Sequence, residues 1–317
     1  MNSEELTLKG KHMKLRTLLL IAMLASSTAL VAATPRESML VPVSWLAAHL
    51  GDANLVLLHI GDKPGYEAAH LPGARHVSLS DIALSDHSGK GLMLEMPAAE
   101  ELRVRLQKLG ISDSSRVIVY YGKDWVSPST RVLLTLDYAG LGDRASLLDG
   151  GMGAWTQAGH ETTTVVPATT EGKLSPLKLQ PLIVDAAYVR ANLGKKGVAV
   201  IDARTPAFYD GVETGGAHES PHRTGHIAGA GSVPYQQITD DALKLRPAEE
   251  LRALFSKAGV RPGDTIIGYC HIGQQATLML FGARSLGHRV LLYDGSFEDW
   301  SRQKDAAVEG PSQKATP

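Results

Sequence analysis

The chain has 317 residues but only one cysteine, Cys270, so no disulfide can form within one molecule. Aromatic residues make up only 5%, and neither sign of charge dominates, with 32 basic against 33 acidic residues. No basic block stands out, so electrostatics gives nucleic-acid binding little support. Hydrophobic residues reach 44%, which is enough for about two cored domains. The lone thiol is therefore either inert core filling or a group kept for chemistry, and its surroundings must decide.

Residues 1–33 have the order of an export signal. Basic residues ending at Arg16 precede an apolar run, and small residues ending at Ala33 follow it. This predicts a signal peptide cleaved after Ala33 and a periplasmic protein. The alternative is an N-terminal membrane anchor that is not cleaved. Contact with a membrane is expected only through this segment, and only if it stays uncleaved. Residues 18–33 are, however, short and diluted by Ser and Thr for a spanning helix of about 20 apolar residues.

Four segments recur in the same order in the two halves of the chain. Such a recurrence predicts a duplicated domain and is far more specific than any one short motif. The pairs are "LVLLHIGD" (55–62) with "VAVIDART" (198–205), "AHLPGARHV" (69–77) with "GHIAGAGSV" (225–233), "RVIVYYGKDW" (116–125) with "DTIIGYCHIG" (264–273), and "ASLLDGGMGAW" (145–155) with "VLLYDGSFEDW" (290–300).

Strand and helix patterns alternate within each half. The recurring segments contain short apolar runs rich in β-branched residues, typical of parallel strands buried on both faces. Residues 98–109 and 247–258 are amphipathic and open with paired glutamates, as a helix start favours. We therefore expect two α/β domains, residues 36–160 and 182–305, each a mainly parallel sheet flanked by helices. The Thr- and Pro-rich residues 161–181 are the predicted linker.

Cys270 directly follows the strand-like "TIIGY" and precedes a helix-like run. A loop at such a junction points backbone N–H groups inward, and the helix adds its positive end, so a thiolate there is stabilised as a nucleophile. Gly273 supplies backbone freedom in the turn. Aligning the repeats places Gly122 opposite Cys270 and makes the first loop three residues longer. Only the second half can then perform thiolate chemistry.

These motifs resemble the tandem-domain rhodaneses, which are thiosulfate and 3-mercaptopyruvate sulfurtransferases. The resemblance rests on "VIDART", "GHIAGAGSVPY", "IIGYCHIGQQA" and "YDGSFEDW" and their counterparts in the first half. It implies an inactive N-terminal domain and an active C-terminal one. It further implies that Cys270 takes sulfane sulfur from a small anionic donor as a persulfide. The acceptor would be cyanide or a thiol, and neither metal nor organic cofactor is expected.

The resemblance also assigns residues around the cysteine. Arg204 matches the family arginine that faces the active loop, where a fixed positive charge suits an anionic donor. Asp202 matches the aspartate at the strand end, a structural support. Arg223 lies where mercaptopyruvate-type enzymes place a substrate-facing arginine. His226 is expected to fix a turn by hydrogen bonding.

The active-site loop departs from both family patterns. Thiosulfate-type loops carry basic residues after the cysteine and mercaptopyruvate-type loops read Cys-Gly-Ser-Gly-Val, whereas here His271, Ile272, Gly273, Gln274 and Gln275 follow. The choice between the two donors is therefore open. His271 either contacts the substrate with a titratable positive charge or points to solvent.

Two sharper alternatives are disfavoured. Phosphatases of this fold have a cysteine, then five loop residues, then an arginine that binds the phosphate. Here the residue at the arginine position is Ala276. His218, His222 and His226 recur every four residues, as metal ligands on a helix would, but Pro221 and neighbouring glycines make the segment a loop.

A carrier that only holds sulfane sulfur for a partner needs the same loop and remains an alternative. A redox sensor is less favoured, since no second cysteine is present to resolve an oxidised thiol. The active site is expected in the cleft between the domains, to which the first half supplies wall rather than chemistry. Trp125 is a candidate to face that cleft, although core packing is the favoured role.

Overall fold

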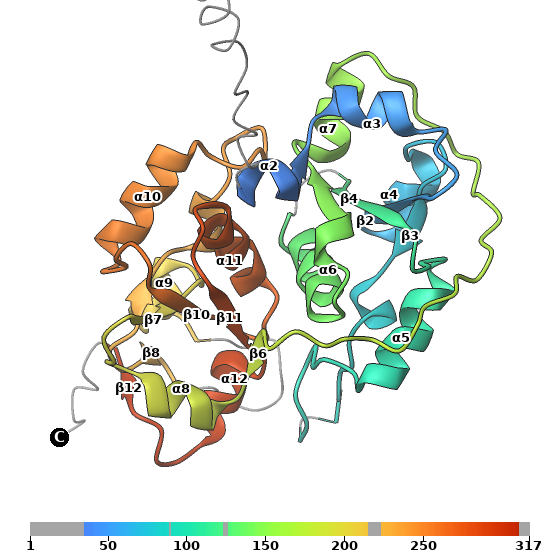
Figure 1. Cartoon of the computed structure of the whole chain (residues 1–317). Coiled ribbons are helices and arrows are strands. Elements are labelled where there is room, and N and C mark those ends of the chain that lie inside the picture. Colours follow the sequence, from blue (N-terminus) through green and yellow to red (C-terminus); the bar gives the residue numbers. More distant parts are fainter. Residues whose placement is uncertain (1–34, 89, 123–125, 215–222, 311–317) are drawn as a thin grey trace, which may run out of the picture. The chain divides into compact units, whose positions relative to one another are not determined.

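The computed structural model describes residues 35–88, 90–122, 126–214 and 223–310, which form two α/β halves (Figure 1). Among these residues no helix is long and apolar enough to cross a membrane. The predicted signal segment, residues 1–33, lies outside them. The prediction of two tandem domains with mainly parallel sheets is confirmed.

The first half contains a five-stranded parallel sheet in the order β1-β5-β4-β2-β3. Its inner strands are apolar and buried over nearly their whole length, as the sequence pattern predicts. The strands are β1 (Leu40–Val41), β2 (Leu55–Ile60), β3 (Arg75–Val77), β4 (Arg116–Tyr121) and β5 (Ala145–Leu148). The helices are α2 (Pro35–Met39), α3 (Val43–His49), α4 (Lys63–Ala68), α5 (Ala99–Lys108), α6 (Ser127–Tyr138) and α7 (Gly151–Gln157), with 3-10 turns at Leu79–Asp81 and Gly142–Arg144.

The second half repeats this plan, with a parallel sheet in the order β6-β11-β10-β7-β9. A separate antiparallel pair, β8 with β12, carries ordered structure past residue 305. The strands are β6 (Ile183–Val184), β7 (Val198–Asp202), β8 (His226–Ile227), β9 (Gly231–Ser232), β10 (Thr265–Tyr269), β11 (Val290–Tyr293) and β12 (Val308–Glu309). The helices are α8 (Ala186–Asn192), α9 (Pro206–Tyr209), α10 (Ala248–Lys257), α11 (Gln275–Ser285) and α12 (Ser296–Arg302), with a 3-10 turn at Tyr235–Gln237.

The two amphipathic segments fold as helices α5 and α10, each a residue shorter at either end than the pattern suggested. Both carry two glutamates in the first turn and a lysine in the last, which complements the helix dipole. Each turns a pair of leucine or phenylalanine side chains into the core, Leu102 with Leu106 and Leu251 with Phe255. Amphipathic burial therefore fixes these helices on their sheets.

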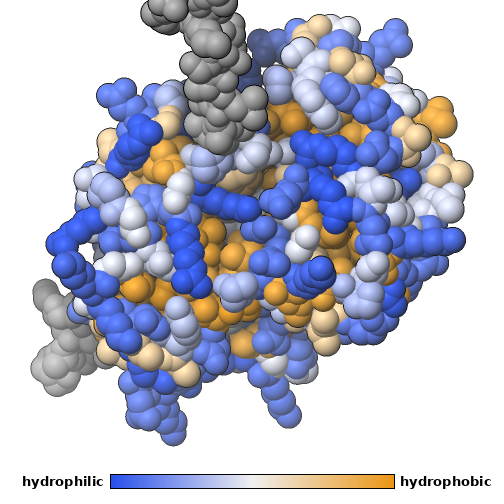
Figure 2. Space-filling view, viewed as in Figure 1, coloured by the Kyte–Doolittle hydropathy of each residue, from blue (hydrophilic) through white to orange (hydrophobic). Residues whose placement is uncertain are grey.

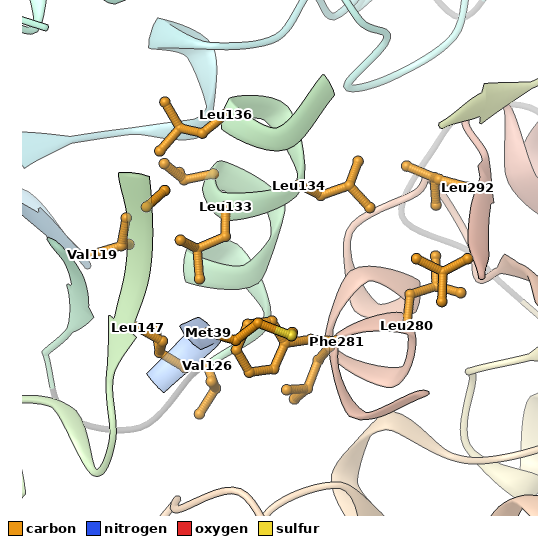
Figure 3. Packing of buried hydrophobic residues seen from close by; sticks show 14 of the residues in the cluster. Met39, Val119, Val126, Leu133, Leu134, Leu136, Leu147, Leu280, Phe281 and Leu292 are labelled. Atoms are coloured by element: carbon orange, nitrogen blue, oxygen red, sulfur yellow. The ribbon is translucent and has the colours of Figure 1, made fainter. Parts of the chain in front are cut away.

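Helices α6 and α11, one from each half, pack against each other. Both are buried along most of their length, and their apolar side chains belong to one continuous core cluster. Figure 3 shows Leu133 and Leu134 of α6, Leu280 and Phe281 of α11, and Met39 of α2 around the contact between these helices. The two halves thus share hydrophobic core, which favours a fixed arrangement of α6 against α11.

The predicted linker is bound to the first half. The main chains of His70 and Thr163 exchange two hydrogen bonds of 2.9 and 2.8 Å. Further along, Lys173 N donates to Ser112 Oγ at 2.9 Å, and Leu174 is buried. Leu177 is partly buried and packs against the same core, whereas Val165 and Val166 are exposed. Polar and apolar residues intermingle on the molecular surface (Figure 2). Hydrogen bonds and the apolar contacts of Leu174 and Leu177 together hold the linker in place.

Candidate active site

Cys270 stands at the carboxyl end of β10, the middle strand of the second sheet, between β7 and β11. The chain then turns into α11, which begins at Gln275. The thiol is fully buried and is not part of a disulfide. In open α/β sheets, ligand sites form outside the carboxyl ends of the strands, and Cys270 occupies such a position.

Helix α12 anchors the loop that follows Cys270. Phe297 N donates to Cys270 O and Glu298 N donates to His271 O, each at 3.0 Å. The C=O and the N–H of one trans peptide point in opposite directions. These two bonds therefore turn the N–H groups of His271 and Ile272 away from α12.

Within the part of the chain that the structure describes, the loop has backbone N–H groups without acceptors on the side that faces away from α12. The N–H groups of Ile272, Gly273 and Gln274 have no hydrogen-bond acceptor within the described residues. Gly273 has φ +78°, and a Cβ there would lie 2.8 Å from Asp294 O, so both its conformation and its space require glycine. Together with the N-terminus of α11, these donors make a cradle suited to an anion beside Cys270.

Ser296 binds the backbone of Cys270 through its hydroxyl. This contact was not predicted from the sequence. Its Oγ accepts from Cys270 N at 3.2 Å and donates to Tyr293 O at 2.9 Å. The residue is fully buried and has φ +52°, which costs a residue with a Cβ about 1 kcal/mol. The backbone of Ser296 is therefore strained at the residue whose hydroxyl binds Cys270 N.

Asp202 and Arg204 form a buried ion pair next to the site. The guanidinium donates Nη2 to Asp202 Oδ2 at 2.6 Å and to Gly225 O at 2.7 Å, and it lies 4.1 Å from the ring centre of Phe297. The pKa of Arg204 is raised overall. Burial lowers it, but the charge and hydrogen bonds of Asp202 raise it, and the charge of a Cys270 thiolate adds to the rise. Asp202 holds the Arg204 guanidinium through these bonds, and its predicted role as structural support of the site stays a prediction. Arg204 is 2% exposed, and the hydrogen bonds of its guanidinium within the described residues go to Asp202 and Gly225 O, not to Cys270.

Arg223 is bound to the end of α12. Its guanidinium donates to the carbonyl oxygens of Trp300, Ser301 and Gln303, each at 3.1 Å. A cation is favourable at a helix C-terminus, where carbonyl groups lack partners. Its predicted contact with the donor stays a prediction.

Aromatic and polar side chains adjoin Cys270. His271 packs edge-on against Phe208, with ring centres 4.5 Å apart. The pKa of Tyr235 is raised by burial and by the charge of a Cys270 thiolate, while Gln275, hydrogen-bonded to it, partly offsets the rise. Ile272 is partly buried and Gln274 is buried, so the loop residues differ in access. Tyr235 is a neighbour of the cysteine that sequence reasoning missed.

The histidines considered as metal ligands are only partly described. His226 is nearly buried, and its Nδ1 lies 2.8 Å from Tyr209 O, which agrees with a turn-fixing role. His218, His222 and Trp125 lie outside the described residues. Within residues 35–88, 90–122, 126–214 and 223–310 no group of three or more His, Cys, Asp or Glu side chains is arranged to hold a metal ion.

The alignment that placed Gly122 opposite Cys270 is wrong by one residue. His59 pairs with Tyr120 across β2 and β4, as Asp202 pairs with Tyr269 across β7 and β10. The two tyrosine hydroxyls have equivalent bonds, each accepting a main-chain N–H at 3.0 Å. The counterpart of Cys270 is therefore Tyr121. The first loop is then four residues longer, not three, and the conclusion that this half lacks a thiol is unchanged.

Comparison with known proteins agrees with this arrangement. A family model described as rhodanese-like domain matches residues 42–158 and again residues 185–303. Thiosulfate/3-mercaptopyruvate sulfurtransferase 2 of Arabidopsis thaliana is 29% identical over 303 aligned residues, covering 86% of each chain. Sulfur carrier protein TtuD of Thermus thermophilus is 28% identical over 274, covering 82% of this chain and 93% of that protein. The crystal structure of YnjE has the same fold, with a TM-score of 0.76 at 23% identity over 93% of this chain and 76% of that one.

Proposed function

Because the chain belongs to the rhodanese family, we propose that it is a sulfurtransferase that carries sulfur as a persulfide of Cys270. Its relatives with sulfurtransferase names support the enzyme class. The observation that carries the mechanism is the loop between Cys270 and α11. Its N–H groups at Ile272, Gly273 and Gln274 have no acceptor in the part of the chain that the structure describes. Such a cradle stabilises both a thiolate and the persulfide anion that replaces it.

The proposed donor is thiosulfate or 3-mercaptopyruvate. With thiosulfate, the Cys270 thiolate attacks the outer sulfur, the S–S bond of the donor breaks, and sulfite leaves with the electron pair. The product is a Cys270 persulfide anion, so the negative charge moves one atom outward and stays within reach of the loop N–H groups. Cyanide or a thiolate then attacks the outer sulfur and restores the Cys270 thiolate, with no net change in the enzyme.

The cations near the site act at a distance in this mechanism. Asp202 and Gly225 O hold Arg204, and the end of α12 holds Arg223, in each case through Nε and Nη2 of the guanidinium. We assign Arg204 the role of a fixed positive field that favours the anionic forms of Cys270. The Cys270 side chain is fully buried in this conformation, so the surrounding residues must move before a donor reaches the thiol.

Steady-state sulfur transfer to cyanide, measured separately with each donor, tests the proposal. Purified protein and a Cys270→Ser variant are compared, with intact mass recorded before and after donor. A mass gain of one sulfur that is absent in Cys270→Ser, with turnover on one donor, supports the enzyme and names its donor. No gain and no turnover with either donor contradicts it.

A sulfur-carrier role is the second candidate, since a relative of similar length is named a sulfur carrier protein. It predicts the same mass gain but slow discharge to cyanide and rapid discharge to a partner protein. The order of these two discharge rates separates the candidates.

We further propose that the protein is exported to the periplasm, on the order of basic, apolar and small residues in positions 1–33. Fractionation of the cells that make it, followed by N-terminal sequencing, tests this. Full-length protein in the cytosol, with its N-terminus intact, would contradict it.

A further inference from the structure

Arg131 belongs to α6 of the half without a cysteine, but its side chain ends in the catalytic loop of the other half. The residue is fully buried. Its Nη1 donates to Gly273 O at 3.0 Å and to Asp294 Oδ1 at 2.7 Å. Its Nη2 is bound to Leu94 O in its own half. A buried cation is thus shared between the two halves, with one acceptor three residues after Cys270.

The bond to Gly273 O orients a loop peptide. Because the C=O and N–H of that peptide point in opposite directions, the carbonyl held by Arg131 turns Gln274 N–H the other way. Helix α12 does the same for the N–H groups of His271 and Ile272 by binding Cys270 O and His271 O. The loop therefore has three fixed carbonyls, two held by its own half and one by Arg131.

The second contact ties Arg131 to the residues that hold Cys270 itself. Asp294 stands two positions before Ser296, whose hydroxyl binds Cys270 N. The other carboxylate oxygen of Asp294 accepts Met96 N at 2.8 Å, again from the first half. Asp294 is thus fixed by two groups of the first half, and with it the start of the turn that carries Ser296.

Neighbouring contacts confirm that the two helix starts meet here. Thr130 Oγ1 and Thr277 Oγ1 are 2.8 Å apart, and Gln274 Nε2 donates to Ser127 Oγ at 3.3 Å. These residues are buried, so the start of α6 contacts the loop and the first turn of α11 directly, without intervening solvent.

We propose that Arg131 is a positioning residue for Cys270: the non-catalytic half completes the anion cradle of the catalytic half through its guanidinium. Arg131 touches the loop carbonyl and not the donor, so it acts on the reactivity of the thiolate and persulfide rather than on donor affinity. The planar guanidinium is needed because it binds Gly273 O, Asp294 and Leu94 O at once, which an ammonium group cannot match. The assignment rests on the proposed function, but its first readout does not.

The first test is the rate at which iodoacetamide alkylates Cys270, followed by intact mass between pH 5 and 9. The label is unambiguous because the chain has one cysteine. We expect Arg131→Met to slow alkylation at pH 7 about tenfold, the order expected when a charge-assisted bond that shapes an anion site is lost, and to move the rate profile to higher pH. Arg131→Lys should recover only part of the rate.

The matched control is Arg284→Met. Arg284 in α11 is paired with Asp137 in α6, so this change also removes a guanidinium–carboxylate pair between the same two helices, but at the end remote from the loop. We expect its alkylation rate to stay within twofold of wild type. In sulfur transfer, Arg131→Met should lower kcat about tenfold with KM within twofold, and Arg284→Met should change neither.

Equal alkylation of Arg131→Met and Arg284→Met overturns the proposal. If Arg131→Met does not fold, Arg131→Lys decides, since a rate equal to that of Arg284→Met again overturns it. If wild type alkylates as expected but transfers no sulfur from either donor, the proposed function fails while the positioning role stands or falls on the alkylation rates alone.

Discussion

The two halves of the molecule share one fold but hold different groups at the end of the middle strand. In both, a buried tyrosine, Tyr120 or Tyr269, receives a main-chain N–H at 3.0 Å. The next residue is Tyr121 in the first half and Cys270 in the second. Tyr121 is buried and donates its hydroxyl to Leu243 O of the other half at 2.8 Å. One half thus uses this position for a contact between halves, and the other uses it for a reactive group.

A second position changes together with the first. Gly151 has φ +51° and its counterpart Ser296 has φ +52°, so the backbone has the same left-handed conformation in both halves. A Cβ on Gly151 would lie 2.5 Å from the ring of Tyr121. Beside Cys270 there is room for a side chain, and the serine hydroxyl binds Cys270 N. The backbone conformation belongs to the fold, whereas the side chain at this position follows from what stands at the strand end.

The neighbouring strand differs in the same way. His59 takes the place of Asp202, and Gly61 that of Arg204. His59 Nδ1 lies 2.9 Å from Tyr120 Oη, and burial, with His76 and His70 nearby, lowers its pKa to about 4. A neutral histidine therefore replaces a charged ion pair. At this strand end, the charged pair beside the loop is present only in the half that has the cysteine.

Of the changes considered, Cys270→Ser should lower sulfur transfer the most. It removes the thiol, so the end of β10 becomes as unreactive as the end of β4, where Tyr121 stands. Sulfur transfer should fall at least about 1,000-fold, since a serine hydroxyl is not ionised near neutral pH and cannot form a persulfide. Initial rates with both donors measure the loss. Residual transfer above a few per cent would show that another group carries sulfur.

Gly151→Ser would give the first half the residue that the second half has. The Cβ meets the Tyr121 ring and the strained φ remains, so we expect a loss of about 2 to 4 kcal/mol in the free energy of unfolding. Urea denaturation measures it. The control is Gly153→Ser in the same helix, where a Cβ meets nothing within 4 Å, and which should be neutral or slightly stabilising. Equal effects of the two variants would refute the pairing of Gly151 with Tyr121.

His59→Asn should flatten the pH dependence of stability. The folded pKa of His59 is about 4 against an ordinary value of 6.5, so between these pH values the unfolded chain binds a proton that the folded chain does not. Wild type should therefore lose up to about 3 kcal/mol as pH falls from 6.5 to 4, and the variant correspondingly less. Urea midpoints of both proteins at matched pH values measure the difference. Parallel curves would exclude the shift.

Ser296→Ala and Ser296→Gly separate strain from hydrogen bonding. Both lose the bond to Cys270 N, so sulfur transfer should fall several-fold in each. Alanine keeps the strained φ whereas glycine relieves it, so the glycine variant should be more stable by about 1 kcal/mol. Thermal unfolding of the pair compares them. An alanine variant as stable as the glycine variant would mean that the φ of +52° is not a cost.

Patterns repeated along the chain were sufficient to predict the two parallel sheets, helices α5 and α10, and the position of Cys270 at a strand end. The register error arose because "YYG" offers two tyrosines to align with the single tyrosine of "GYC". The strand pairing and the hydroxyl bonds of Tyr120 and Tyr269 decide between them. The roles of Arg131 and Ser296 depend on contacts far along the chain and on a dihedral angle. Neither leaves a local signal in the sequence, so both required the structure.

The guanidinium that crosses from α6 into the loop has a consequence for partial unfolding. Arg131 and its acceptors Gly273 and Asp294 come together only when both halves have folded and docked. Mild denaturant that parts the halves before either one melts would leave Cys270 on an intact sheet yet slow to react. The reactivity of this thiol would then report on assembly of the molecule, earlier and more sharply than circular dichroism, which follows secondary structure alone.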